Sequence, residues 1–323
     1  MVAERSGLLI HAGYPKTGSS WIQRFLFQNS DAGFAPLFGE DVSMRGAVMK
    51  VMILPNALVF DPIDSLKHFH PAILEVTGKG LVPVLSHERL AGTPHSGGYD
   101  SKELANRLAA VFPGAKVLLV IREQKSMIVS TYKQYVRNGG PCSLGGYLRP
   151  PRSDGRMPLF DFGYFEYHRL VGYYQELFGQ ANVLVLPYEQ FRDDPKGFVW
   201  TIVTFAGAKA RPGTVEGLSY STREYPGLSG FSIAIKRRLN RIVGRRDSVN
   251  PQVLIPISRG RELVLERFLK RLEAVVPGSF HKALDQRLTA AVFRAIGDRY
   301  TRSNSLLAEL LGLELGRYGY DVG

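Results

Sequence analysis

The sequence has few cysteines, no long hydrophobic run and fewer acidic than basic residues. Its single cysteine, Cys142, excludes a disulfide framework or a cysteine-rich zinc site within the chain. No stretch approaches about 18 consecutive apolar residues, and no long apolar segment precedes the first expected strand, so we predict neither a membrane span nor a secretory signal. These absences favour a cytoplasmic protein, and a reducing compartment is compatible with the lone thiol.

Basic residues outnumber acidic ones, 41 to 29, which gives a formal net charge of +12. Such a charge favours anionic partners, such as a nucleotide, a glycan, a nucleic acid or an anionic lipid, but does not choose among them. The composition is otherwise ordinary for a globular protein, with 45% hydrophobic residues. We predict one domain over residues 1–323, because no linker-like stretch divides the chain.

The beginning of the chain reads as a strand, a glycine-containing turn and the start of a helix. An apolar run at residues 8–10 leads into GYPKTGSS, residues 13–20. This order presents backbone N–H groups and the positive end of a helix dipole to an anion. The spacing resembles a Walker A loop, but Ser19 stands at the position of the conserved lysine and the lysine here is Lys16. We therefore expect a phosphorylated nucleotide other than a magnesium-bound triphosphate.

The segment YPKTGSSW, residues 14–21, resembles the 5′-phosphosulfate loop of the sulfotransferases that use PAPS (3′-phosphoadenosine 5′-phosphosulfate). It matches the family pattern Y-P-K-[ST]-G-[ST]-[ST]-W at every position. The resemblance implies PAPS as co-substrate, PAP as product and no metal. It also implies that the nucleotide is bound by Lys16, Thr17, Gly18, Ser19, Ser20 and Trp21.

A second pattern follows the apolar run at residues 116–121. Arg122, Ser130 and Tyr132 form R-x₇-S-x-Y, which resembles the 3′-phosphate motif of the same family. An arginine suits a phosphate because its planar guanidinium donates two parallel hydrogen bonds. The resemblance implies that Arg122 and Ser130 bind the 3′-phosphate.

Two weaker features complete the predicted nucleotide site. PYEQF, residues 187–191, with a following Asp-Pro, is similar to the family's Y-E-[DE]…DP stretch, which implies that Tyr188 and Trp21 line the adenine. The family's usual R-K-G element near the C-terminus is absent. The basic run Lys236, Arg237 and Arg238 is predicted to replace it against the 3′-phosphate.

Apolar runs that alternate with helical periodicity predict an α/β fold. We expect three layers, similar to a P-loop NTPase: a central parallel sheet of about four to five strands with helices on both faces. The nucleotide-binding core should span about residues 7–205. The predicted cap or acceptor elements are residues 29–80, 137–160 and 206–258, followed by C-terminal helices over 259–313 that cover the sheet.

Catalysis of sulfuryl transfer needs a group that stabilises the leaving phosphate and a base for the acceptor. Lys16, inside the loop, is the candidate for the first role. Ser86-His87-Glu88-Arg89 follows an apolar strand, where α/β enzymes place their chemistry. Glu88 and His87 are both candidates for the base, and Glu88 is favoured.

Two other functions compete with sulfuryl transfer. A P-loop NTPase or small-molecule kinase is disfavoured by Ser19 and by the lack of a clear acidic magnesium site. A basic amphipathic segment at residues 232–246 permits binding to nucleic acid or to an anionic membrane. We predict peripheral membrane contact as possible and no nucleic-acid partner. The acceptor, a hydroxyl or an amine of a small molecule, lipid or glycan, is left open by the sequence.

Overall fold

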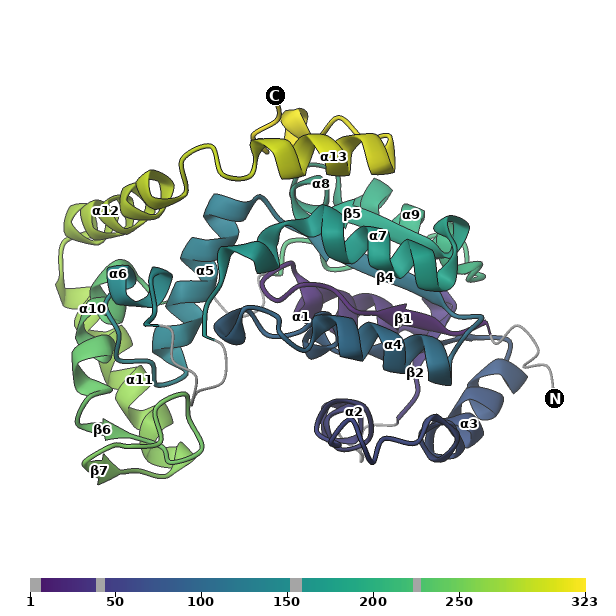
Figure 1. The fold of residues 1–323 in the computed structure, drawn as a ribbon, viewed down its shortest axis with the longest axis horizontal. Coiled ribbons are helices and arrows are strands. Elements are labelled where there is room, and N and C mark those ends of the chain that lie inside the picture. The colour runs from purple at the N-terminus through teal and green to yellow at the C-terminus, as the bar shows by residue number, and fades with distance from the viewer. Residues whose placement is uncertain (1–6, 39–43, 152–158, 223–227) are drawn as a thin grey trace.

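The computed structural model describes residues 7–38, 44–151, 159–222 and 228–323. A parallel sheet of five strands runs through the middle of the molecule in the order β2-β3-β1-β4-β5 (Figure 1). The strands are β1 (Leu9–His11), β2 (Phe34–Pro36), β3 (Val82–Ser86), β4 (Lys116–Ile121) and β5 (Val183–Pro187). Parts of the three predicted acceptor segments, residues 39–43, 152–158 and 223–227, lie outside the described residues.

Each strand turns alternate side chains to opposite faces of the sheet, because the side-chain period of a strand is two. Val117, Leu119 and Ile121 of β4 join one hydrophobic core, whereas Leu118 and Val120 join the other. The predicted three-layer α/β architecture with helices on both faces is therefore confirmed. Both β1 neighbours are parallel strands, so its carboxyl end is flanked by those of β3 and β4.

The first core packs the sheet against α3 (Pro62–Gly78), α4 (Ser101–Val111) and α7 (Tyr167–Phe178). The second packs it against α9 (Pro195–Ala206) and the helix that follows β1. That helix begins as α1 (Ser19–Trp21) and continues as a π-helical segment over Ile22–Phe27. The longer helices up to this point in the fold are α3 (Pro62–Gly78), α4 (Ser101–Val111), α5 (Gln124–Arg137), α7 (Tyr167–Phe178) and α9 (Pro195–Ala206). The shorter helices are α2 (Met44–Val48), α6 (Leu144–Leu148) and α8 (Tyr188–Asp193).

The chain after α9 builds a helical module at one end of the molecule (Figure 1). It consists of α10 (Gly230–Leu239), the short paired strands β6 (Val243–Gly244) and β7 (Ile255–Pro256), α11 (Arg259–Val275) and α12 (Gly278–Ile296). α12 packs on α5 and α10, and α11 packs on α10. The expectation that the C-terminal helices cover the sheet is wrong for α11 and α12, because their partners are helices; α13 (Thr301–Leu311) packs on α7, which does cover the sheet.

Candidate active site

The loop of residues 12–18, the predicted phosphate loop, connects β1 to α1 and has two residues in the left-handed region of the backbone. Lys16 has φ 68° and Gly18 has φ 81°. A non-glycine residue with positive φ is uncommon, and such residues cluster at active sites and ligand-binding loops. At Gly18 the positive φ favours glycine, and an added Cβ would also lie 3.2 Å from the Tyr188 ring, which would have to shift slightly.

The hydroxyl side chains at and after the loop differ in burial and in hydrogen bonding. Thr17 is fully buried and its hydroxyl donates to the carbonyl oxygen of Tyr14 at 2.6 Å. Ser19 is mostly buried, and its Oγ lies 3.4 Å from that of Thr17. Ser20 is exposed. Thr17 therefore holds the loop in shape, and Ser19 and Ser20 begin a helix whose N-terminus has no side-chain cap.

Arg122 is held against this loop. Its Nη1 donates to the carbonyl oxygen of Lys16 at 3.1 Å, and its Nε donates to Ser126 Oγ at 3.1 Å. The guanidinium carbon lies 5.2 Å from the centre of the Tyr188 ring. Three segments that are distant in the sequence, the loop and the ends of β4 and β5, thus meet at one edge of the sheet.

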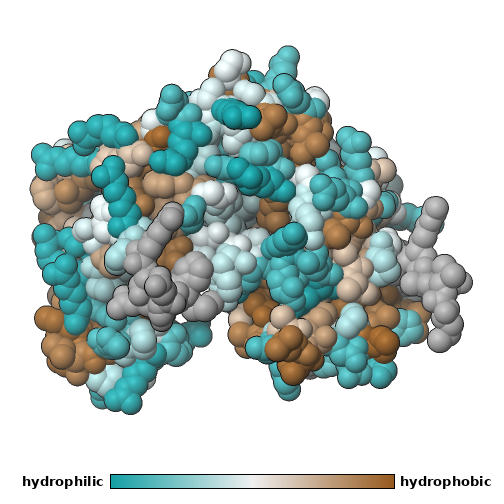
Figure 2. All heavy atoms as spheres, viewed as in Figure 1, coloured by the Kyte–Doolittle hydropathy of each residue, from teal (hydrophilic) through white to brown (hydrophobic). Residues whose placement is uncertain are grey.

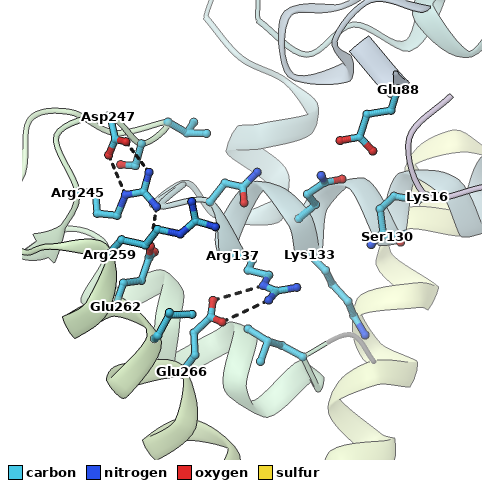
Figure 3. Close-up of a pocket in the computed structure, with 16 residues that line it drawn as sticks. Lys16, Glu88, Ser130, Lys133, Arg137, Arg245, Asp247, Arg259, Glu262 and Glu266 are labelled. Carbon is cyan, nitrogen blue, oxygen red and sulfur yellow. Dashed lines mark hydrogen bonds and ion pairs between the residues drawn. The ribbon is translucent and has the colours of Figure 1, made fainter. Parts of the chain in front are cut away.

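A cavity of about 730 Å³ opens beside the loop, which is within the usual size range of ligand sites. Lys16, Glu88 and Ser130 lie at one end of it (Figure 3). Arg245, Arg259 and Glu262 lie at the other end, and Arg137 lies between the two groups. The structure therefore brings three predicted site residues, from the loop, the end of β3 and α5, to one cavity.

The local environment lowers the pKa of the Lys16 ammonium from its usual value. Burial is the main cause, and the positive charges of Arg122 and Arg137 act in the same direction, while the Glu88 carboxylate opposes them. These causes place Glu88 and Arg137 within electrostatic reach of Lys16.

The two candidate bases lie in different surroundings. His87 is only 3% exposed, and its Nδ1 accepts a hydrogen bond from the backbone N–H of Arg89 at 3.0 Å, so it caps the short helix that follows β3. Glu88 is partly exposed and lines the cavity together with Lys16. This arrangement turns Glu88, rather than His87, toward the space beside the loop.

The three basic residues predicted on α10 lie in different surroundings in the structure. Lys236 is 1% exposed, and its ammonium lies 3.3 Å from both Glu262 and Glu266. Arg238 is exposed and donates to the carbonyl oxygen of Ala234 within its own helix. Arg237 is half-buried. None of these three residues lines the cavity beside Lys16.

Four other cations line that cavity and were not singled out from the sequence: Lys133, Arg137, Arg245 and Arg259. A signal for two of them existed, since Lys133 and Arg137 follow Ser130 by three and seven residues on α5 and so share its face. Arg245 falls within the basic segment predicted at residues 232–246, whereas Arg259 carried no such signal. Both reach the cavity from the helical module.

The aromatic residues expected around the adenine are close to the loop but largely covered. Trp21 is 4% exposed and its indole Nε1 donates to the carbonyl oxygen of Ser219 at 3.1 Å. The Tyr220 ring stacks on Trp21 with ring centres 5.3 Å apart, and Phe191 packs on it as well. Tyr188 is half-buried between Gly18 and Arg122. Tyr220 is a candidate site residue that the sequence patterns did not reveal.

No group of three or more histidine, cysteine, aspartate and glutamate side chains within the described ranges could hold a metal ion. In the same ranges, no helix has the length and apolarity needed to cross a bilayer.

Comparison with known proteins assigns the chain to a family. A family model for the sulfotransferase domain matches residues 8–224. A sulfotransferase from Alicyclobacillus acidocaldarius is similar in structure at 20% sequence identity and a TM-score of 0.45, over 68% of this chain and 86% of that one. The sulfotransferase domain from the curacin biosynthetic pathway is similar at 15% identity and a TM-score of 0.36, over 64% of this chain and 75% of that one. A search of curated proteins found no match. Because the family model spans well over half of its length, the chain belongs to the sulfotransferase domain family.

Proposed function

We propose that this protein transfers a sulfuryl group from PAPS to a hydroxyl or amine of an acceptor and releases PAP. The observation that carries the proposal is the phosphate loop itself, with Lys16 in a left-handed conformation and Arg122 hydrogen-bonded to its carbonyl oxygen. Glu88 lines the same cavity as Lys16 and completes the site with a carboxylate.

The residues present fit a nucleotide that is phosphorylated at both ends. The left-handed residues of the loop and the uncapped N-terminus of α1 suit the 5′ end, where the oxygens carry negative charge. Arg122 and Ser130 suit the 3′-phosphate. Tyr188 and Trp21 suit the purine, provided that Tyr220 moves from the face of Trp21 that it now covers.

Lys16 acts in the proposed reaction by stabilising the negative charge that develops on the leaving phosphate. PAPS supplies the activated sulfuryl group when it is bound. The Lys16 ammonium is already desolvated, which strengthens its interaction with a developing anion. The Glu88 carboxylate accepts the proton of the acceptor hydroxyl as the new oxygen–sulfur bond forms.

The cavity also bears on the acceptor. Its lining contains five cations and four carboxylates and only a few apolar side chains, among them Leu228 and Leu263. Such walls suit a polar acceptor with several hydrogen-bonding groups better than a phenol or another largely apolar alcohol. The cavity thus favours a polar small molecule or a glycan over the apolar candidates.

The test of this function uses Lys16→Met, which keeps the aliphatic stem and removes the charge. We expect sulfuryl transfer from PAPS, followed by mass spectrometry over a panel of polar acceptors, to fall by at least about 100-fold. Lys196→Met, at an exposed lysine of α9, is the matched control and should retain activity.

Nucleotide binding provides an independent readout of the same proposal. PAP without magnesium should raise the melting temperature of the wild type, and ATP with magnesium should not. Absence of any thermal shift or calorimetric heat with PAP would overturn the proposal, whereas stabilisation only by ATP with magnesium would assign the loop to a kinase or NTPase.

A further inference from the structure

Helix α11 separates its charges between two faces. Its three acidic residues, Glu262, Glu266 and Glu273, all point into the helical module. Glu262 and Glu266 flank the buried Lys236 at 3.3 Å, and Glu273 accepts a hydrogen bond from the backbone N–H of Ser229 at 3.1 Å. The acids are therefore used to attach α11 to α10, and none is left for the outer face.

The outer face of α11 is basic and apolar at once. Val264, Phe268 and Val275 are 56%, 54% and 82% exposed and recur every four or seven residues, so they form one line along the helix. The exposed cations Arg261, Arg267 and Arg271 flank this line, and the exposed Lys270 lies on the side of the helix nearer the cavity, four residues after Glu266. None of these four forms an ion pair with an acid among the residues that the structure describes.

A second apolar element lies directly before α11 in the chain. Leu254 is 80% exposed and Ile255 of β7 is 53% exposed. In the space-filling view a hydrophobic patch covers the lower left of the molecule, where Figure 1 places β6 and β7 (Figure 2). Exposed apolar side chains gathered in this way generally mark a surface that another body covers.

We propose that the outer face of α11, together with Leu254 and Ile255, docks on an anionic membrane surface. The apolar line can enter the boundary between head groups and acyl chains, while the flanking cations contact anionic lipid head groups. This is the pattern of a helix that lies in the plane of a membrane interface, here carried by a folded domain.

Charge decides between this occupant and a second copy of the chain. A twofold dimer would place the face against itself and bring its three arginines, Arg261, Arg267 and Arg271, against three more. Like charges at an interface disfavour association, and the face has no exposed acid to compensate. A nucleic acid would pair with the cations but would leave Val275 and Phe268 against water or phosphate. An anionic lipid surface can accommodate both the cations and the apolar side chains.

The experiment is flotation of the full chain with vesicles at physiological salt. We expect the wild type to float with vesicles of phosphatidylcholine and phosphatidylglycerol, and not with phosphatidylcholine alone. Arg267→Gln with Arg271→Gln should weaken that binding roughly 25-fold, as expected for the removal of two interfacial cations. Phe268→Ser with Val275→Ser should weaken it as well.

Two control variants separate this face from general effects of charge and hydrophobicity. Lys196→Gln with Lys209→Gln removes two exposed lysines elsewhere, and Leu58→Ser with Ile63→Ser removes two exposed apolar residues that precede and begin α3. Both controls should bind vesicles as the wild type does. Equal loss in the controls, or no loss in the α11 variants, would overturn the proposal.

Two further outcomes would also overturn it. One is a dimer in light scattering that Phe268→Ser dissociates, with no vesicle binding by either form. The other is RNA binding that the arginine variant loses and the Phe268→Ser variant keeps, again without binding to vesicles. The vesicle assay contains no nucleotide, so its result does not depend on the proposed sulfuryl transfer.

Discussion

At the scale of single residues, the site depends on which side chains turn toward Lys16. His87 and Glu88 are neighbours in the sequence, but the start of a short helix after β3 gives them different roles. His87 is buried as a cap, and Glu88 lines the cavity. Adjacent residues on a strand end cannot both face one space, and the backbone turn decides which of them does.

Glu88→Gln and His87→Gln should therefore differ in their effect on turnover. We expect Glu88→Gln to lower kcat by about 100-fold or more, since general-base catalysis contributes about 10² to 10⁴. His87→Gln should mainly lower stability, because it alters a buried cap. Steady-state kinetics with saturating PAPS, alongside thermal melting of both variants, makes the comparison. Normal turnover in Glu88→Gln would exclude that carboxylate as the base.

At the scale of elements, α5 connects the nucleotide to the rest of the cavity. One face of it carries Ser130, Lys133, Gln134 and Arg137 into the cavity. Arg137 lies 3.3 Å from Glu266 of α11 and also lowers the pKa of Lys16. The helix thus links the helical module to the loop through charge as well as through packing.

Replacement of Arg137 should change the pH dependence of catalysis in a defined direction. Because its positive charge lowers the pKa of Lys16, Arg137→Gln should raise that pKa and move the alkaline fall of kcat/KM to higher pH. Lys133→Gln on the same helix is the matched control, since the Lys133 ammonium is held by Asp285 at 2.6 Å. A pH–rate profile that shifts equally in both variants, or in neither, would contradict this assignment.

At the scale of the whole molecule, two histidines from distant segments are shielded from water, His11 fully and His95 in part. His11 at the end of β1 is 1% exposed with Nδ1 2.7 Å from Ser86 Oγ, and His95 has Nδ1 2.9 Å from the Tyr147 hydroxyl. Burial lowers the pKa of each from 6.5 to about 4. Both imidazoles are therefore neutral in the folded protein over a range where the unfolded chain binds protons.

This difference makes stability depend on pH below neutrality. The contribution of each histidine is fully present above its unfolded pKa of 6.5 and is lost as the pH falls toward about 4. Between pH 7 and pH 5 each should lower the free energy of unfolding by about 2 kcal/mol. Urea unfolding at the two pH values measures this fall in the free energy of unfolding. His11→Gln should remove about half of the fall that the two histidines cause together. His70→Gln, at an exposed histidine, should leave the fall unchanged. If the fall in the free energy of unfolding between pH 7 and pH 5 is the same in His11→Gln as in the wild type, protonation of His11 is not linked to stability.

The prediction of a single domain over residues 1–323 stays a prediction, as do the contacts of the individual site residues with a nucleotide. The sequence by itself determined the parallel sheet, the phosphate loop and the position of Arg122, because apolar runs, glycine spacing and motif order act over short stretches of chain. It was also sufficient to name Lys16 and the pair His87 and Glu88.

Only the tertiary structure decided which basic residues face the cavity. Lys236 was expected there, but the packing of α11 on α10 buries its charge between two glutamates, and Arg245 and Arg259 line the cavity instead. The physical reason is that a buried ammonium must be paired, and the acids that pair it arrive from a helix some 26 to 30 residues farther along the chain. A local sequence pattern cannot show which distant acids will pair with Lys236. The phosphate loop, in contrast, is specified by residues that are adjacent in the sequence.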